Sequence, residues 1–247
     1  MNGIHREVWH FLRHQGLYLI GVTSPVVLSI SFWQNWLIAT GQSHDLMQQW
    51  LLSINADPVH WYKMPLLHIQ LREILPAFVA DLLFNALAIL AIDRCAHQRD
   101  ISVRSLWKTA IESGPALFFS QILAQLVIFS GLLLLILPGI YLSGRLLLVS
   151  IEVMLDPQHV PLQALQRSWN LTAGRVWSLL GGYALWGILR MLLLGVIGVA
   201  FTLSSAISGG DQVTKIVIDI IRQCLGIWLY LPLLVYLYRV RSVQGAV

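Results

Sequence analysis

Residues 116–156 read ALFFSQILAQLVIFSGLLLLILPGIYLSGRLLLVSIEVMLD. As a single helix this almost uninterrupted apolar stretch would extend roughly 60 Å, about twice the hydrocarbon thickness of a bilayer. The chain must therefore reverse within it. The strongest turn signal is Pro138-Gly139, because proline presets φ and glycine accepts a positive φ. The stretch predicts two membrane-spanning helices, at about 116–137 and 139–156, joined by a hairpin tip at Leu137–Ile140.

The rest of the chain also has the composition of a membrane protein. Of its 247 residues, 57% are apolar and only 11% are charged, and the mean hydropathy is +0.70. A soluble domain carries about 25% charged residues, so this composition excludes an ordinary soluble fold. The ten Trp residues fit a chain that meets the membrane–water interface many times.

Four further apolar stretches are long enough to cross a bilayer, which takes about 20 residues. The six predicted spans cover about 17–40, 73–93, 116–137, 139–156, 176–205 and 216–238. We therefore expect an all-α polytopic membrane protein with six transmembrane helices. Residues 1–247 would form a single integral membrane domain, with an outer loop at about 41–72.

The positive charges are distributed unequally between the two sides that six spans define. Ten of the sixteen Lys and Arg fall on the side that holds both termini, three fall on the other side, and three lie within spans. Because cytoplasmic loops are enriched in Lys and Arg, this distribution predicts that both termini lie in the cytosol.

A short amphipathic pattern occurs three times, each time just before a predicted span. The copies cover about 3–15, 101–113 and 161–173, contain Trp9, Trp107 and Trp169, and end near Gly16, Gly114-Pro115 and Gly174. Apolar residues recur on one face while the cations point elsewhere, a pattern typical of a helix lying in the headgroup region. We expect three hairpins, each preceded by a cytosolic interfacial helix with its Trp as an anchor. The alternative is that each stretch extends a span into water.

One segment resembles a known family. Its residues are Pro138-Gly139-Ile140, Glu152, Asp156, Ala164-Leu165, Ser168-Trp169 and Gly174-Arg175. This segment is similar to the YciC-like family of bacterial inner-membrane proteins, which is related to a membrane domain fused to some glycerophosphodiester phosphodiesterases. The resemblance covers about 45 residues and agrees elsewhere only in layout. It implies a bacterial cytoplasmic membrane location and a link to envelope lipids, and it supplies no catalytic residues.

Five ionisable residues are predicted to lie at mid-to-outer depth inside spans, where each costs roughly 2.5–3.5 kcal/mol on insertion scales and is a functional candidate. With one asparagine, they are predicted to form a polar cluster in the outer half of the bundle: Asp81, Asn85, Arg145, Arg190, Asp219 and Arg222. A surplus arginine there would suit an anionic group such as a lipid phosphate. The alternative is a set of internal ion pairs between helices, with Arg145 or Arg222 reaching outward.

The other polar residues give weaker indications of a functional site. Glu152 lies nearer the cytosol, either as a separate titratable group or as a helix-packing or interfacial residue. His10 and His14 have helical ligand spacing but no third ligand nearby in sequence. Neither a nucleophile elbow, nor a glycine-rich phosphate loop, nor a zinc-protease motif occurs. We therefore predict no catalytic residues, no metal site and no cofactor.

Two functions from different classes follow. The first is a non-enzymatic bundle that organises envelope lipids or binds another envelope protein. The second is a transporter or flippase for a small or amphipathic anion, which would use the Arg/Asp cluster. An intramembrane enzyme is a third reading without a supporting motif. Membrane lipids are the expected partners and nucleic acid is not. A water-filled cavity reaching Arg190 would favour transport, whereas a dry packed core would favour a scaffold.

Overall fold

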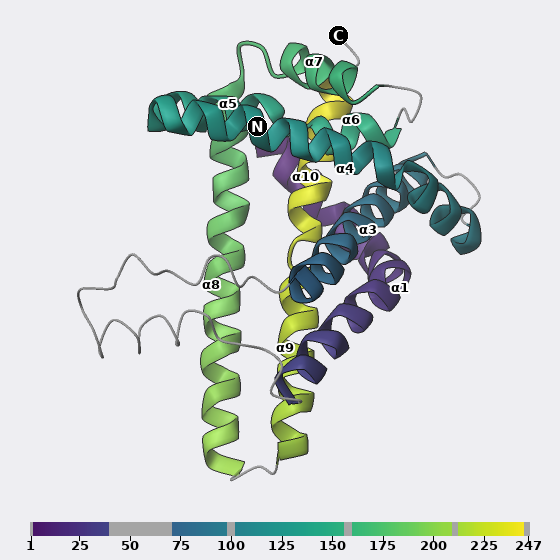
Figure 1. The fold of residues 1–247 in the computed structure, drawn as a ribbon, viewed down its shortest axis with the longest axis vertical. Helices are drawn as coiled ribbons and strands as arrows, with labels where there is room; N and C mark the ends of the chain where they lie inside the picture. The colour runs from purple at the N-terminus through teal and green to yellow at the C-terminus, as the bar shows by residue number, and fades with distance from the viewer. Residues whose placement is uncertain (1, 40–70, 98–101, 156–159, 209–211, 245–247) are drawn as a thin grey trace.

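The computed structural model describes residues 2–39, 71–97, 102–155, 160–208 and 212–244, and within these ranges it contains helices and no strands. The helices are α1 (Asn2–Ala39), α3 (Leu71–Ala96), α4 (Val103–Leu134), α5 (Ile136–Leu146), α6 (Val149–Leu155), α7 (Pro161–Leu171), α8 (Val176–Ser208), α9 (Gln212–Trp228) and α10 (Leu231–Gln244) (Figure 1). The predicted outer loop at about 41–72 lies almost wholly outside the described residues.

Six helical segments in the described part of the chain are long and apolar enough to cross a membrane. They are Gly3–Asn35, Pro76–Ala96, Val103–Leu134, Ile136–Leu155, Val176–Phe201 and Ile216–Val243. Each overlaps one predicted span, so the all-α class and the six apolar helices are confirmed. The fourth segment is built from α5 and α6, and the sixth from α9 and α10.

Two of the three amphipathic stretches are not separate helices. α1 continues through Gly16, and α4 continues through Gly114 and Pro115, so the predicted breaks at these positions are absent. An interior glycine weakens a helix by only about 1 kcal/mol, and a proline kinks a helix more readily than it ends one when tertiary packing holds both sides. Val8 and Phe11 provide such packing, because both are buried in the core.

The third amphipathic stretch contains a separate helix, α7. α7 begins at Pro161, where the missing N–H and the preset φ suit a first helical position. It ends at Leu171, and the chain then turns through Gly174, whose φ of 75° favours glycine. The interfacial position of α7 and the grouping into three hairpins stay predictions.

The reversal between α4 and α5 falls earlier than the predicted tip at Leu137–Ile140. Leu135 leaves the helix with φ −162° and ψ 147°, while its N–H still donates to the Gly131 carbonyl at 3.0 Å. Pro138 therefore lies in the first turn of α5, where its missing N–H costs little. A Cβ on Gly139 would lie 2.8 Å from the Leu132 backbone nitrogen. Gly139 thus permits the close approach of α5 to α4 and does not form the turn.

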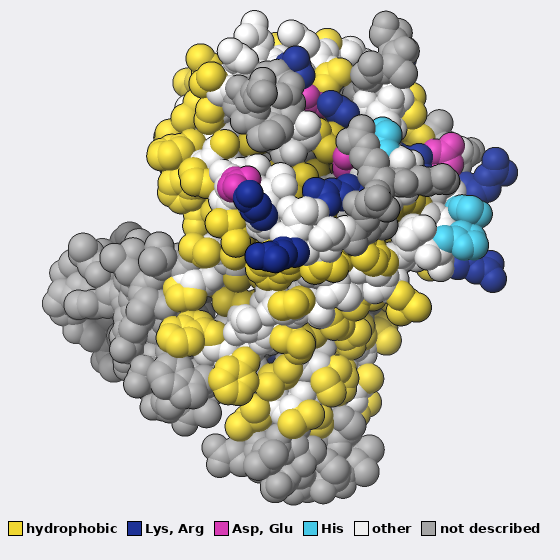
Figure 2. Space-filling model, turned by 90° about the vertical axis from the view of Figure 1, so that its right-hand side faces the viewer, with side chains coloured by type: hydrophobic (Ala, Val, Ile, Leu, Met, Phe, Trp, Pro, Cys, Tyr) yellow, Lys and Arg dark blue, Asp and Glu magenta, His cyan; other side chains and the backbone are white. Residues whose placement is uncertain are grey.

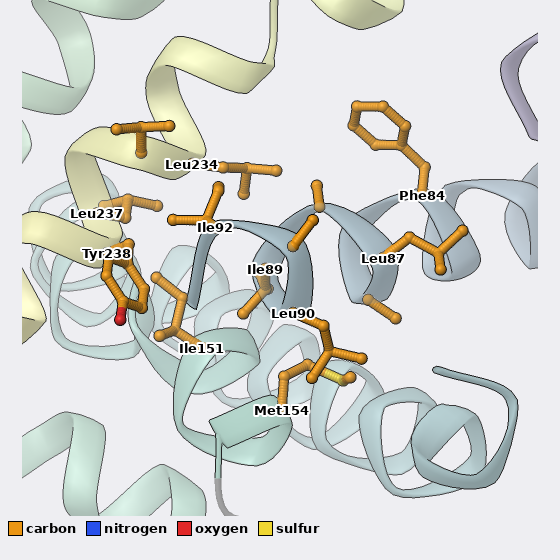
Figure 3. Packing of buried hydrophobic residues seen from close by; sticks show 14 of the residues in the cluster. Phe84, Leu87, Ile89, Leu90, Ile92, Ile151, Met154, Leu234, Leu237 and Tyr238 are labelled. Carbon is orange, nitrogen blue, oxygen red and sulfur yellow. The ribbon is translucent and has the colours of Figure 1, made fainter. Parts of the chain in front are cut away.

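The hydrophobic core is centred on α3. All side chains from Phe84 to Ile92 are buried, so this part of the helix is apolar on every face except at Asn85. A helix that is apolar all round is expected to be buried on all sides. Figure 3 shows residues of α3 lying between α10 and α6, with labelled neighbours Leu234, Leu237, Tyr238, Ile151 and Met154.

The helices do not run side by side. Figure 1 shows α8 and α9 along the long axis, with α4 and α5 lying crosswise at one end. α7 and both termini lie at this same end. In Figure 2 the charged and histidine side chains gather there, above a surface that is mostly hydrophobic. On this face, the described residues therefore form one polar end and a mostly apolar remainder.

Candidate ligand cavity

α3 carries two polar side chains one turn apart within residues 74–92, which are otherwise apolar. The Asn85 Nδ2 group donates a hydrogen bond to the Asp81 backbone carbonyl at 2.8 Å. The Asp81 carboxylate accepts no hydrogen bond from another described residue. Both side chains line a cavity of about 550 Å³ that is walled by α3, α4, α5, α6, α8, α9 and α10. This volume lies within the usual range for a small-molecule site.

Arg190 enters the same cavity from α8. Its Nη2 donates to the Gly226 carbonyl at 3.2 Å, and its guanidinium carbon lies 5.2 Å from the centre of the Tyr230 ring. Its Nε is buried and has no hydrogen-bond partner among the described residues. The guanidinium is thus anchored on one side and retains an unused donor on another. The structure thus places Asp81, Asn85 and Arg190 around one cavity.

Neutral polar groups complete the wall. Gln121 and Gln125 lie one turn apart on α4 and both line the cavity. The Gln121 Nε2 group donates to the Ser150 hydroxyl at 3.1 Å, which joins α4 to α6. Tyr183 of α8 also lines the space. The shared face of the two glutamines was visible in the sequence, but nothing there indicated that it meets Arg190.

A second, smaller cavity of about 150 Å³ adjoins the first. It lies between α1, α3 and α9, and Gln34 is a polar residue on its α1 side. Three residues line both cavities: Asp81, Phe84 and Ile227. Asp81 therefore faces both spaces, and the two apolar side chains form the partition beside it.

Arg145 does not belong to this group, which corrects the predicted cluster. Its Nε donates to the Tyr141 hydroxyl at 2.9 Å, and its Nη1 donates to the Trp169 carbonyl at 2.8 Å. Its guanidinium carbon lies 4.6 Å from the centre of the Trp169 ring. The Arg145 carbonyl in turn accepts hydrogen bonds from Ser168 and Thr172. The prediction was wrong because α5 lies crosswise beside α7, so counting residues from the turn does not measure depth.

We expect Arg145→Met to loosen the contact between α5 and α7. Methionine keeps most of the apolar stem but removes two hydrogen bonds and the cation–π contact, a loss of about 1–3 kcal/mol. The measurement is the free energy of unfolding in detergent micelles. Arg175→Met is the matched control, because Arg175 is exposed just beyond α7. Equal stabilities of the two variants would contradict the structural role of Arg145.

Asp219 and Arg222 also lie elsewhere. They form an ion pair at 2.9 Å on α9, and their side chains are 44% and 48% exposed. Neither lines either cavity. An ion pair this exposed contributes at most about 1 kcal/mol. The six predicted residues therefore separate into a cavity group, an α5–α7 contact and a surface pair.

Glu152 occupies a position that the sequence did not reveal. It is 1% exposed on α6 and accepts a hydrogen bond from the Arg241 Nε of α10 at 2.9 Å. Its other carboxylate oxygen lies 4.0 Å from the Arg167 Nη1 of α7. The carboxylate thus connects three helices, in keeping with the helix-packing alternative. The only sequence signal was an acidic residue in an apolar stretch.

The three predicted anchor tryptophans differ in their surroundings. Trp9 and Trp169 are exposed, as interfacial anchors would be. Trp107 is partly buried and packs against the core. Their position relative to lipid stays a prediction.

No protein-family model, no curated protein and no solved structure matches this chain. Its function is therefore argued from the cavity and its charged groups.

Proposed function

We propose that this integral membrane protein is a transporter that binds a small charged or amphipathic solute inside its helical bundle. The observation that carries the proposal is the cavity lined by Asp81, Asn85 and Arg190. Ionisable side chains within membrane helices are costly, and they commonly mark substrate pathways. Transporter sites also lie between helices in the interior of the bundle. A structural scaffold has no need for a charged void of this size.

The smaller cavity supports passage of the solute beyond a single binding site. Phe84 and Ile227 separate the two spaces, and Asp81 faces both. Rotation of one apolar side chain would join them, and a solute held at Asp81 would then remain in contact with the carboxylate as it moved. The two cavities support a route that runs past α3 toward α1.

The proposed location is a bacterial cytoplasmic membrane, with both termini and α7 on the cytosolic side. The charged side chains at the end that holds the termini support this orientation under the positive-inside rule (Figure 2). The bacterial location rests on the resemblance to the YciC-like family. The three-hairpin arrangement belongs to the same proposal, with α7 lying along the headgroups.

A second candidate is a role in organising envelope lipids or binding another membrane protein. The exposed apolar surface of α8 favours it, since Leu185, Leu192 and Val196 are each more than half exposed. Lipid chains or a partner helix would cover such a surface. This role would not use the charged cavity, and for that reason transport is the proposed function.

Arg190→Leu is expected to reduce solute uptake into proteoliposomes at least tenfold. Among the described residues, Arg190 supplies the only guanidinium that lines the cavity. The solutes offered are inorganic phosphate, glycerol 3-phosphate, glycerophosphoethanolamine and alanine, each radiolabelled. Arg222→Leu is the matched control, because it removes an arginine from an apolar helix outside the cavity and is expected to leave uptake unchanged.

Thermal unfolding midpoints of both variants check that the cavity variant is folded. Reduced uptake in a folded Arg190→Leu variant supports the proposal. Uptake by that variant at the wild-type rate, or no uptake of any solute above that of protein-free liposomes, would contradict transport through this cavity.

A further inference from the structure

The charges of the cavity indicate which kind of solute fits it. We infer that the ligand is a zwitterion, whose ammonium group binds Asp81 and whose phosphate or carboxylate group binds Arg190. This inference rests on the proposed function and deepens it. It also changes the expectation drawn from the sequence, in which a surplus of arginines favoured an anion.

The described residues that line the cavity include one charge of each sign. Of the three arginines in the predicted cluster, only Arg190 lines it, and of the two aspartates only Asp81 does. The remaining polar lining, including Asn85, Gln121 and Gln125, is neutral. The formal charge of the described lining is therefore zero and not positive. A ligand with zero net charge and both signs matches it.

Asp81 and Arg190 line the same cavity from α3 and α8, and among the described residues no ion pair joins them. Within the described part of the chain, the buried Arg190 Nε has no hydrogen-bond partner. The Asp81 side chain is exposed and lines the same cavity. A buried guanidinium nitrogen without a hydrogen-bond partner is costly. A ligand with a cation at one end and an anion at the other satisfies both groups at once.

A ligand of one sign would satisfy only half of the site. An anion bound to Arg190 would lie near the unneutralised Asp81 carboxylate, and a cation bound to Asp81 would lie near the guanidinium. Like charges within one cavity repel each other strongly, because the dielectric constant of an enclosed protein space is low. Tyr230 and the Gly226 carbonyl hold the guanidinium on one side, so Arg190 is not free to turn away from a bound cation.

A ligand with an ammonium group and an acidic group can come from two sources in a membrane. One is the headgroup of a zwitterionic lipid such as phosphatidylethanolamine, and the other is a free solute with the same two groups. The site recognises the ammonium and the acidic group in either case. The experiment therefore needs one arm for each source.

The soluble arm measures the affinity of the purified protein in nanodiscs for three matched compounds. Glycerophosphoethanolamine carries both charges, glycerol 3-phosphate carries only the anion, and ethanolamine carries only the cation. We expect the wild-type protein to bind the first at least tenfold more tightly than the others. The lipid arm compares the retention of phosphatidylethanolamine and phosphatidylglycerol by native mass spectrometry, and preferential retention of the zwitterionic lipid identifies the headgroup as the source.

Two cavity variants are expected to change the selectivity in opposite directions. Asp81→Asn should lose about tenfold or more in affinity for glycerophosphoethanolamine and then prefer glycerol 3-phosphate. Arg190→Leu should lose a similar factor and then prefer ethanolamine. Asp219→Asn and Arg222→Leu are the matched controls on the surface of α9, and both should behave as the wild type.

The outcomes separate this inference from the proposed function. One contrary outcome is that the wild type binds glycerol 3-phosphate as tightly as glycerophosphoethanolamine or more tightly, with this binding unaffected by Asp81→Asn and abolished by Arg190→Leu. That result would overturn the zwitterion as the ligand and would still support a ligand-binding cavity. Identical behaviour of the cavity variants and the surface controls in both arms would overturn the zwitterion and the ligand-binding cavity together. Opposite shifts in selectivity would support the inference.

Discussion

Arg241→Leu is expected to lower the free energy of unfolding by about 3–5 kcal/mol, the range for breaking a buried ion pair from one side. Glu152 is 1% exposed, so its carboxylate cannot regain water when Arg241 is removed. Its remaining described partner, Arg167, lies 4.0 Å away. The variant would therefore hold a buried carboxylate without close compensation, and α10 would lose its polar contact with α6. The measurement is reversible unfolding of the purified protein in detergent micelles.

Substitution of the other member of the pair, Glu152, should lower the free energy of unfolding by less. Glu152→Gln leaves Arg241, which is 30% exposed, and Arg167, which is 49% exposed, and both can be hydrated. Replacing both members of the pair with apolar side chains, Glu152→Met with Arg241→Leu, should restore most of the stability lost by Arg241→Leu alone. Equal losses for Arg241→Leu and Glu152→Gln, or no recovery in the double variant, would show that desolvation of Glu152 is not the cause.

Gly182→Ala is expected to destabilise the contact between α8 and α10 by about 1–3 kcal/mol, the usual cost of overpacking a core. A Cβ at this position would overlap the Tyr236 hydroxyl and the ring carbon that bears it. Tyr236 is fully buried, and its ring stacks on His5 with the ring centres 5.4 Å apart. Because the ring is held from both sides, α8 and α10 would have to separate. The loss is measured as a lower free energy of unfolding.

The neighbouring glycine provides the matched control. A Cβ on Gly181 meets nothing within 4 Å, so Gly181→Ala should leave stability unchanged or raise it by up to about 1 kcal/mol through helix propensity. Tyr236→Phe should recover part of the loss in the Gly182→Ala background, because its hydroxyl is the nearest atom and has no hydrogen-bond partner among the described residues. Equal effects at the two glycines would rule out a close approach at Gly182.

The polar residues illustrate how far sequence reasoning reaches. Asp81, Asn85 and Arg190 were expected together because each interrupts an apolar helix, and they do share a cavity. Arg145 was assigned to the same group by counting residues from an expected turn. That count assumes that all spans run parallel, whereas α5 lies crosswise at one end of α8 (Figure 1). Depth along the chain therefore did not correspond to depth in the fold.

The turn itself shows a similar limit. Pro138-Gly139 is a strong local turn signal, yet the chain reverses at Leu135 and both residues join α5. Turn propensity describes the isolated dipeptide, whereas the close packing of Gly139 on α4 depends on the partner helix. The same distinction applies to Gly16 and Gly114, which are helix breakers by propensity but lie inside continuous helices.

The sequence by itself determined that the chain is helical and has six helices apolar enough to cross a membrane, because length and hydropathy are properties of each segment alone. It also determined which residues would be costly inside such helices. Only the tertiary structure decided which of them meet. Glu152 and Arg241 are separated by 89 positions along the chain, and Asp81 and Arg190 lie on different helices. Such contacts depend on how the helices cross, which follows from packing across the whole core and from no single segment.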